Sequence, residues 1–266
     1  MKIVRFLSGG AEHFGRQLDG NTAVEIEGGL LGPRRETGRT LRIEKLLAPL
    51  VPTDILCIGL NYREHAAESG SAIPQNPMLF IKSSNALNNP FDPIPVPRRS
   101  SQIDYEGELA VVIGPRPAKH VSRAAAMEYV LGYTCANDVS ARDWQRDKAL
   151  GGGQFARGKS FDGFCPLGPC VVTADEVPNP NALRLRTLLN GQVMQDHTTA
   201  DMIFDVPMLI ESLSSTMTLR PGAVILTGTP QGVGFARNPP VWMKDGDVVV
   251  VEIEKVGRLE NPVRVE

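Results

Sequence analysis

Hydrophobic residues along the chain occur in short runs that often alternate with polar ones, which is typical of β-strands. Ile3–Leu7 and Thr22–Ile26 have this pattern, and the continuous apolar run Ile55–Gly59 predicts a buried strand. The other predicted strands are about Gln102–Ile113, Gly132–Ala136, Cys170–Thr173, Arg184–Leu189, Val224–Thr227, Asp247–Glu254 and Asn261–Val265.

Predicted helices are few and short. One covers about Tyr62–Ser69, where Asn61 can cap the first turn, with a glutamate three residues later, and Gly70 can end the helix. The others cover about Ala124–Tyr129 and Val139–Lys148. Because strands outnumber helices and regular helical crossovers are missing, we expect a mainly β protein with short helices, of the α+β class, and not a doubly wound sheet.

The chain divides into two predicted regions. Residues 1–50 form a small N-terminal β-rich region that includes the Gly/Pro/Arg stretch Gly28–Arg39 and the segment Leu41–Leu50. Pro49 and Pro52 bracket the predicted linker to the main domain, residues 51–266. A chain of 266 residues is long enough for one main domain with such an appendage.

Composition narrows the class of protein. Hydrophobic residues make up 42% of the chain and charged residues 22%, with a net charge of −2, as in an ordinary soluble globular protein. No basic stripe indicates a nucleic-acid partner, and no apolar run is long enough for a membrane span or a secretion signal. The cysteines form no C-x-x-C pair, so we expect buried thiols in a reducing compartment: the cytoplasm, with an organelle as the alternative. They are Cys57, Cys135, Cys165 and Cys170.

The strongest chemical signal is the acidic start of the strand pattern at Gln102–Ile113. Glu106 and Glu108 lie two residues apart, on the same face as Asp104, and their Cα atoms are expected roughly 6.6 Å apart. Two glutamates that converge repel each other unless a cation lies between them, and hard oxygen ligands favour Mg²⁺, Mn²⁺ or Ca²⁺. The alternative is a solvated acidic strand face.

Asp138 is a candidate third ligand. It follows the strand pattern that ends at Ala136, at a predicted strand-to-helix turn, where functional groups are common. The alternative is that Asp138 only caps the next helix.

These residues belong to motifs that resemble the fumarylacetoacetate hydrolase family, in its shorter form, from about Ile55 to the C-terminus. Four separate motifs stand in the order and spacing of that family. They are Glu106-x-Glu108, Asn137-Asp138-Val139-Ser140-Ala141-Arg142, Gly158-Lys159-Ser160-Phe161-Asp162 and Thr227-Gly228-Thr229-Pro230-x-Gly232-Val233-Gly234.

The resemblance implies a mixed β-sandwich roll of the type found in the C-terminal domain of that family, usually as a homodimer. It also implies one Mg²⁺ or Mn²⁺ per chain, held by Glu106, Glu108 and Asp138. The active-site lysine of the family corresponds to Lys159. Its mobile His–Glu pair, on a short helix that closes over the substrate, corresponds to the residues at 65 and 68.

His65 and Glu68 are three residues apart on the predicted helix, so their side chains can meet. A carboxylate beside an imidazole raises the basicity of the histidine, so the pair can activate water or carry a proton. The alternative is a surface ion pair. The remaining histidines have no comparable setting, and we interpret them as structural: His13, His120 and His197.

Three further residues are predicted to bind substrate. Arg142 and Gln145 lie one turn apart on the predicted helix and can hold a carboxylate or keto oxygen. Thr229 lies in a Gly/Pro turn, where its hydroxyl can contact a substrate oxygen. The alternatives are an ordinary helix face and simple turn chemistry.

Lys159 also lies in a segment, 153–160, that matches the phosphate-binding pattern G-x-x-x-x-G-K-[ST]. That pattern needs a strand before it and a helix after it, but the preceding residues are polar or helical and the next ten include two glycines and two prolines. We therefore expect a flexible Gly151–Gly153 segment leading to a functional lysine. For Lys159 alone, the alternative is a solvated surface lysine.

The expected function is a divalent-metal-dependent hydrolase that cleaves a C–C bond in an acylpyruvate-like or β-diketo acid through a metal-bound enolate. Lys159 would stabilise the developing oxyanion or protonate the enolate. The alternatives are an oxaloacetate decarboxylase or tautomerase, a related oxo-diacid decarboxylase or isomerase, and a non-catalytic metal-binding scaffold. The expected partner is a small 2-oxo acid, with no nucleic acid and no membrane.

Overall fold

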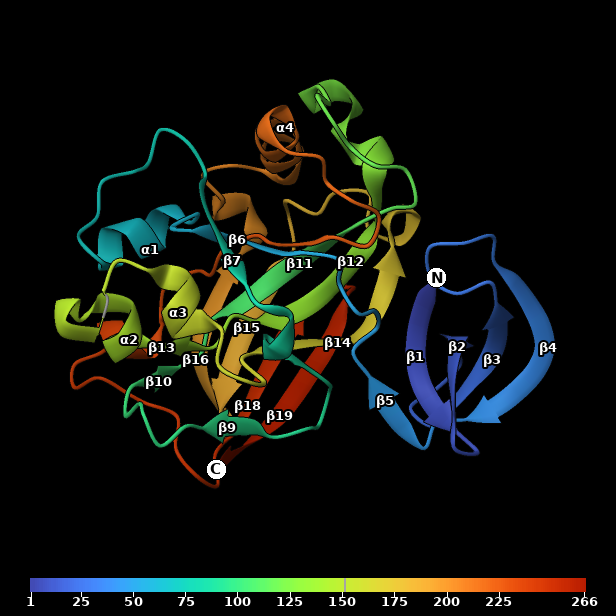
Figure 1. The fold of residues 1–266 in the computed structure, drawn as a ribbon, viewed down its shortest axis with the longest axis horizontal. Coiled ribbons are helices and arrows are strands. Elements are labelled where there is room, and N and C mark those ends of the chain that lie inside the picture. The colour runs from blue at the N-terminus through green and yellow to red at the C-terminus, as the bar shows by residue number, and fades with distance from the viewer. Residues whose placement is uncertain (151) are drawn as a thin grey trace.

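A large mixed sheet dominates the computed structural model, which describes residues 1–150 and 152–266 (Figure 1). Its strands follow the order β4-β3-β2-β1-β14-β12-β11-β17-β6-β7, with β5 beside β1 and β8 beside β14. Most neighbours are antiparallel, but β6 and β17 run parallel. The strands are β1 Lys2–Ser8, β2 Ala11–Gln17, β3 Thr22–Glu27, β4 Arg35–Arg42, β5 Lys45–Leu47, β6 Ile55–Gly59, β7 Met78–Lys82, β8 Leu87–Asn88, β11 Gly107–Ile113, β12 Val130–Asn137, β14 Cys165–Thr173 and β17 Val224–Leu226.

A second sheet packs against the first and has the order β16-β15-β18-β19-β9. Apolar residues of β11 and β12 share a core with β15, β18 and β19, so the two sheets bury one another. The strands are β9 Ile94–Val96, β15 Arg184–Leu189, β16 Gln192–Thr198, β18 Val248–Ile253 and β19 Gly257–Val265. A small ladder joins β10 Ile103–Asp104 to β13 Ser140–Ala141.

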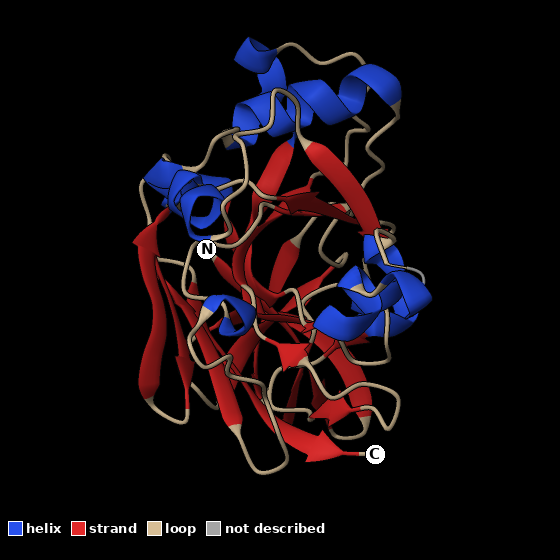
Figure 2. Cartoon of the chain, turned by 90° about the vertical axis from the view of Figure 1, so that its left-hand side faces the viewer, coloured by secondary structure: helices blue, strands red, loops and turns tan. Residues whose placement is uncertain are grey.

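Helices are short and lie at the edges of the sheets (Figures 1 and 2). Three of them, α1 to α3, gather on the side of the molecule opposite the N-terminal strands β1 to β4. No helix in the described ranges is both long enough and apolar enough to cross a membrane. The helices are α1 Arg63–Glu68, α2 Arg142–Arg146, α3 Phe155–Lys159 and α4 Val206–Thr216, with 3-10 turns η1 Ser84–Ala86, η2 Arg123–Tyr129, η3 Lys148–Leu150, η4 Ala174–Glu176, η5 Thr199–Asp201 and η6 Gly234–Ala236.

The expectation of a mainly β fold with short helices is confirmed. The N-terminal strands are continuous with the main sheet, because Lys2 and Ile3 of β1 pair with Val172 and Val171 of β14. The Gly/Pro/Arg stretch Gly28–Arg39, for which no strand was predicted, contains the start of β4. That strand exposes most of its side chains, so it has almost no apolar pattern.

Two predictions at helix starts are wrong. Asn61 does not cap α1, which begins after Tyr62 without a side-chain cap. Its amide instead donates to the carbonyls of Phe204 and Thr227, which ties the start of α1 to the end of β17. The helix expected at 139–148 is shorter, because residues 140–141 pair as strand β13 and α2 covers only Arg142–Arg146. Asp138 is therefore not a helix cap.

Candidate metal centre and cavity

Three carboxylates meet at one point inside the main sheet. One oxygen atom each of Glu106, Glu108 and Asp138 lies within 4.8 Å of the other two, and all three residues are buried. Burial excludes the alternative of a solvated acidic strand face. The structure therefore brings together the three residues that the sequence predicts as metal ligands.

Strand pairing fixes this convergence. Glu108 lies in β11 opposite Ala136 of β12, and Asp138 follows the end of β12. The strand expected from Gln102 is broken before Gly107, so the backbone at Glu106 instead bonds to the end of β12. Its carbonyl accepts from the Asp138 N–H at 2.9 Å and its N–H donates to Asn137 Oδ1 at 3.0 Å.

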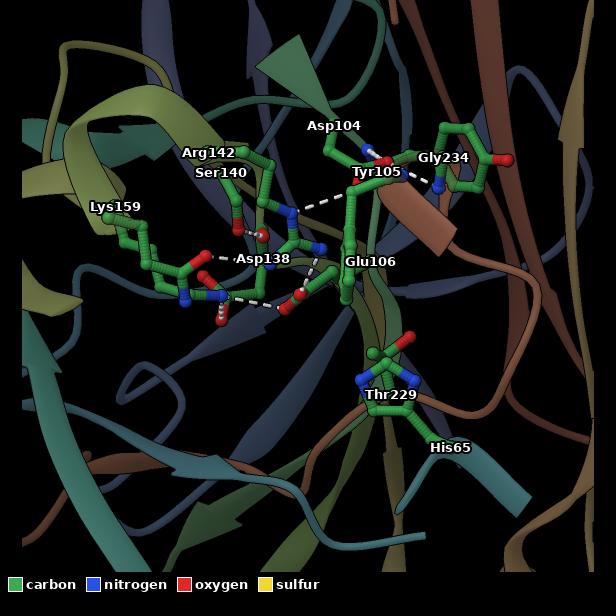
Figure 3. Close-up of polar contacts among 12 residues, drawn as sticks. His65, Asp104, Tyr105, Glu106, Asp138, Ser140, Arg142, Lys159, Thr229 and Gly234 are labelled. Atoms are coloured by element: carbon green, nitrogen blue, oxygen red, sulfur yellow. Dashed lines mark hydrogen bonds and ion pairs between the residues drawn. The ribbon is translucent and has the colours of Figure 1, made fainter. Parts of the chain in front are cut away.

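A lysine and an arginine hold Glu106. The Lys159 ammonium donates to Glu106 Oε2 and to Asp138 Oδ2, both at 2.6 Å (Figure 3). Nη2 of Arg142 lies 2.6 Å from Glu106 Oε1. Burial alone would raise the pKa of Glu106, but Lys159 and Arg142 hold it well below its usual value. Lys159 is 2% exposed, which excludes the reading of a solvated surface lysine.

Lys82 is a site residue that the sequence analysis did not identify. Its buried ammonium donates to Asp138 Oδ1 at 2.6 Å and to the carbonyl of Val139 at 3.1 Å. Each oxygen of Asp138 therefore has its own lysine, Lys82 on one side and Lys159 on the other. An ionised carboxylate oxygen has further lone pairs, so both oxygens can still coordinate a cation.

Glu108 differs from the other two carboxylates. It is 1% exposed, and its Oε2 accepts from the N–H of Gly228 at 2.6 Å. Among the described residues, no cationic side chain forms an ion pair with it. Burial, followed by the charges of Asp138 and Glu106, raises its pKa well above the usual value. A buried carboxylate in this state needs either a proton or a cation.

The donor set fits a divalent metal ion. Ligand oxygens on opposite sides of Mg²⁺ lie roughly 4.2 Å apart. The nearest oxygens of the three carboxylates, within 4.8 Å of one another, have a similar separation. Among the described residues, four buried carboxylates of this site face three buried cations, which leaves one unbalanced negative charge. The carboxylates are Asp104, Glu106, Glu108 and Asp138, and the cations are Lys82, Arg142 and Lys159.

Asp104 lies apart from the triad, although the sequence places it on the same strand face. Its carboxylate accepts from Arg142 Nε at 2.8 Å and from the N–H groups of Gly234 and Phe235 at 2.7 and 3.0 Å. Burial raises its pKa, and Arg142 opposes that shift. Asp104 thus orients Arg142 and anchors the loop after β17.

Arg142 and Gln145 are both buried and bonded to each other. Nη1 of Arg142 donates to Oε1 of Gln145 at 2.9 Å. Since Asp104 and Glu106 also hold the guanidinium, its charge is largely neutralised before any ligand arrives. The amide nitrogen of Gln145 has no protein acceptor in the described chain, so it can donate to a ligand.

Thr229 borders the same site with its hydroxyl already engaged. It donates to the carbonyl of Gly107 at 3.0 Å and accepts from Gln195 Nε2 at 2.7 Å. Gly107 must be glycine here, because a Cβ would lie 2.1 Å from Thr187 Oγ1. The Thr229 hydroxyl therefore holds the strand that carries the glutamates, and it can only accept from a ligand.

The histidine and glutamate of α1 also meet. His65 Nδ1 lies 3.1 Å from Glu68 Oε2, and Glu68 Oε1 accepts from the N–H of Gly232 at 2.9 Å. The ring of Phe235 packs edge-on against the imidazole. The helix is thereby held against the loop after β17. With Nδ1 occupied by Glu68, Nε2 is the ring nitrogen left for proton transfer.

A cavity of about 160 Å³ connects these groups. Glu106, Glu108, Lys159 and Thr229 line it together with His65. Further walls come from Arg142, Gln145 and Arg146, and from the apolar side chains Ile58, Leu60, Met78, Phe80, Phe155 and Phe235. A larger depression of about 590 Å³ lies elsewhere, beside the N-terminal strands, and contains none of these residues.

The phosphate-loop pattern is a chance match, as the sequence analysis expects. Lys159 ends helix α3, whereas a phosphate loop requires its lysine at the start of a helix. Within the glycine segment expected to be flexible, residue 151 lies outside the described residues.

Comparison with known proteins identifies the family. The fumarylacetoacetate (FAA) hydrolase C-terminal family matches residues 54–264, and an Rv2993c-like N-terminal family matches residues 1–49. The chain belongs to the fumarylacetoacetate hydrolase family. It is an enzyme of that superfamily, whose members include hydrolases, isomerases and tautomerases.

Relatives of this family cover most of the chain. A fumarylacetoacetate hydrolase domain-containing protein 2 homolog from Dictyostelium discoideum is 48% identical, over 83% of this chain and 74% of its own length. The mitochondrial oxaloacetate tautomerase of Xenopus laevis is 47% identical, over 82% of this chain and 68% of its own length. A structure named 5-carboxymethyl-2-hydroxymuconate delta-isomerase, from Mycobacterium smegmatis, has a TM-score of 0.86 and 41% identity, covering both chains fully.

Proposed function

We propose that this protein is a divalent-metal-dependent tautomerase that interconverts the keto and enol forms of a small 2-oxo acid, with oxaloacetate as the substrate. The observation that carries the proposal is the buried cluster of Glu106, Glu108 and Asp138, in which no cationic side chain among the described residues forms an ion pair with Glu108. The similarity to oxaloacetate tautomerases supports the choice of substrate, since those of Xenopus laevis and Rattus norvegicus are 47% and 45% identical to this chain.

The three carboxylates would hold Mg²⁺ or Mn²⁺, because hard oxygen ligands favour these ions. When bound, the ion would accept the carboxylate and keto oxygens of the substrate and stabilise negative charge on the keto oxygen. Glu106 and Asp138 are oriented by Lys159 and by their other cationic neighbours, which supports their role as ligands.

Tautomerisation requires one proton to move between carbon and oxygen, and it consumes no water. We assign that transfer to His65, whose Nε2 would take a proton from C3 of the keto acid and deliver it to the keto oxygen, with the same two transfers reversed in the other direction. Glu68 would hold the required imidazole tautomer through Nδ1. Coulombic attraction of Asp138 and Glu106 outweighs the effect of burial and raises the pKa of Lys159, so it stays protonated and provides positive charge rather than a base.

The size of the cavity agrees with a small substrate. A volume of about 160 Å³ is well below the roughly 300–1,000 Å³ of pockets that take drug-sized ligands. A four-carbon acid fits this scale, with its reacting end at the carboxylates and His65. Gln145 would donate to a substrate oxygen, with Arg142 and Thr229 completing the proposed binding residues.

Hydrolysis of a C–C bond in an acylpyruvate-like or β-diketo acid is the second candidate. It is supported by the same contact of 3.1 Å between His65 and Glu68, because such a pair can activate water for attack on a distal carbonyl. Decarboxylation of oxaloacetate would use the same site. A non-catalytic scaffold is disfavoured because the cluster, the proton-transfer pair and the cavity occur together.

The discriminating experiment is an NMR time course of the purified protein with oxaloacetate or acetylpyruvate, with Mg²⁺ and with EDTA. Metal-dependent acceleration of the keto–enol interconversion of oxaloacetate, with no loss of carbon, supports the tautomerase. Formation of acetate and pyruvate from acetylpyruvate would instead support the hydrolase. Formation of pyruvate and CO₂ from oxaloacetate would instead support the decarboxylase.

The assembly and location of the protein are also proposals. The family resemblance supports a homodimer, with a small 2-oxo acid as the only other partner, and no nucleic acid or membrane. We retain the cytoplasm as the proposed compartment, although several relatives are named as mitochondrial proteins. Fractionation of the native cell tests the location, and light scattering of the purified chain tests the dimer.

A further inference from the structure

Arg146 borders the catalytic cavity at its exposed edge. Its guanidinium carbon lies 4.4 Å from the centre of the Phe235 ring, and that of Arg142 lies 4.5 Å from the same ring. Both arginines come from α2, and both line the cavity. Arg142 is buried whereas Arg146 is exposed, so one lies at the inner end of the cavity and the other at its opening.

The two arginines differ in their charge partners. Arg142 is held by Asp104 and Glu106, so it offers little free charge to a ligand. Within the described ranges, Arg146 forms no ion pair with any carboxylate, although Asp143 and Asp147 border the shallow groove on its other side. Of the described positive groups that line the cavity, Arg146 is therefore the one whose charge is not paired with a described carboxylate.

The rest of the cavity offers few anion partners away from the carboxylates. Much of its lining is apolar, including Phe80 and Phe155, and Lys159 is committed to Glu106 and Asp138. A ligand whose reacting end lies at the carboxylates would extend its other end toward the opening. A second carboxylate at that end would meet Arg146, whose fork of N–H groups suits bidentate binding.

We infer that Arg146 is a specificity-determining residue that binds the distal carboxylate of a 2-oxo diacid. The inference rests on the proposed function, because it assumes that the reacting 2-oxo acid group lies at Glu106, Glu108 and Asp138. It adds the prediction that the enzyme selects diacids over monoacids through one residue at the opening. Phe235 holds the guanidinium in place without neutralising it.

Malate and lactate test this inference by binding, because they differ by one distal carboxylate and neither undergoes tautomerisation. Calorimetric titrations use the full-length, Mg²⁺-loaded protein and its Arg146→Gln variant. The wild-type protein is expected to bind malate more tightly than lactate. Arg146→Gln is expected to weaken malate binding about tenfold, the scale of a hydrogen bond to a charged group, and to change lactate binding less than about twofold.

Two further variants serve as controls. Arg146→Lys keeps the charge without the fork and is expected to retain part of the preference for malate. Arg157→Gln removes a comparable charge, because Arg157 is also an exposed arginine over an aromatic ring, lying 5.0 Å from the centre of the Trp144 ring. Unlike Arg146, Arg157 does not line the cavity. It is expected to bind both ligands as the wild-type protein does.

Equal loss of malate and lactate binding in Arg146→Gln would overturn the inference, as would a similar loss in Arg157→Gln. Equal or absent binding of both ligands by the wild-type protein would also overturn it. Turnover of oxaloacetate is measured separately. Turnover without selectivity would reject only the role of Arg146, and Arg146-dependent selectivity without turnover would reject only the proposed reaction.

Discussion

Nζ of Lys82 donates to Oδ1 of Asp138 at 2.6 Å, and the two side chains are 0% and 1% exposed. Lys82 ends β7, the edge strand of the main sheet, and lies 56 residues before its partner. Because the other Asp138 oxygen binds Lys159, the carboxylate is held from both sides. The orientation of this proposed metal ligand therefore depends on a strand remote in sequence.

Replacing Lys82 with Met should destabilise the fold. The change would leave Asp138 buried with one of its two cationic partners missing, and breaking a buried ion pair typically costs about 3–5 kcal/mol of unfolding free energy. Urea unfolding in EDTA measures this loss. Lys45→Met is a matched control, because Lys45 pairs with Asp92 on the surface and should cost less than about 1 kcal/mol. Similar losses in the two variants would contradict the account.

Glu108→Gln should weaken metal binding without weakening the metal-free fold. The glutamine oxygen can still accept from Gly228, and the change removes a carboxylate that forms no ion pair with any described cation. We expect the melting temperature in EDTA to be unchanged or slightly higher than that of the wild-type protein. The stabilisation by added Mg²⁺ or Mn²⁺ should be lost. Full metal stabilisation in this variant would exclude Glu108 as a ligand.

Glu106→Gln should behave differently in the same unfolding assay. Glu106 is paired with Lys159 and Arg142, so its neutralisation leaves two buried cations less well balanced. In EDTA the variant should have a lower melting temperature than the wild-type protein. It should also lose the stabilisation by added Mg²⁺ or Mn²⁺. If Glu106→Gln and Glu108→Gln had equal stability in EDTA, the difference in charge compensation described above would be wrong.

Glu68→Gln should lower turnover while sparing the metal centre. Glu68 contacts His65 and the N–H of Gly232, and neither contact involves a proposed ligand. Loss of proton transfer by a positioned side chain typically costs about 10²–10⁴-fold, and a weakened partner for His65 should cost part of that range. Titration with Mn²⁺ should show that the variant binds the ion with the affinity of the wild-type protein. A variant with normal turnover would exclude proton transfer through this pair.

The thiols should be unreactive in the native protein. All four cysteines are free and buried, and burial raises the pKa of Cys165 to about 12 and that of Cys170 to about 11. Very little thiolate is therefore present at pH 8. A disulfide exchange reagent should label the native protein slowly and the urea-unfolded protein at once. Rapid labelling of the native chain would contradict the described burial.

Sequence patterns predict strands with a clear apolar signal well. β6 and β15 match the predicted ranges in full, because β6 is a continuous buried run and β15 alternates buried and more exposed residues. β2 exposes most of its residues at least partly and was not predicted, since it lacks that signal. Helix α4 did have usable signals that the analysis missed. Asp205 caps it, a proline follows in the first turn, and apolar residues recur at helical spacing.

The carboxylates of the candidate site could be predicted because two of them stand two residues apart in one motif and the third directly follows the neighbouring strand. Their cationic neighbours could not all be found in this way. Lys82 lies in a short strand with no motif, and only the sheet brings it to Asp138. Arg146 follows a predicted binding residue directly, but only the three-dimensional structure shows that it lines the cavity and that none of the described carboxylates pairs with it.

The carboxylate cluster is proposed to hold a metal ion for keto–enol interconversion. The most direct measurement follows the decay of enol absorbance by stopped flow, after an enol-enriched oxaloacetate solution is mixed with the Mg²⁺-loaded protein. We predict a fast, enzyme-dependent decay that EDTA abolishes and that Glu108→Gln reduces to the buffer rate. A wild-type rate equal to that of buffer with both Mg²⁺ and Mn²⁺, or an equal enzymatic rate in EDTA, would contradict the account.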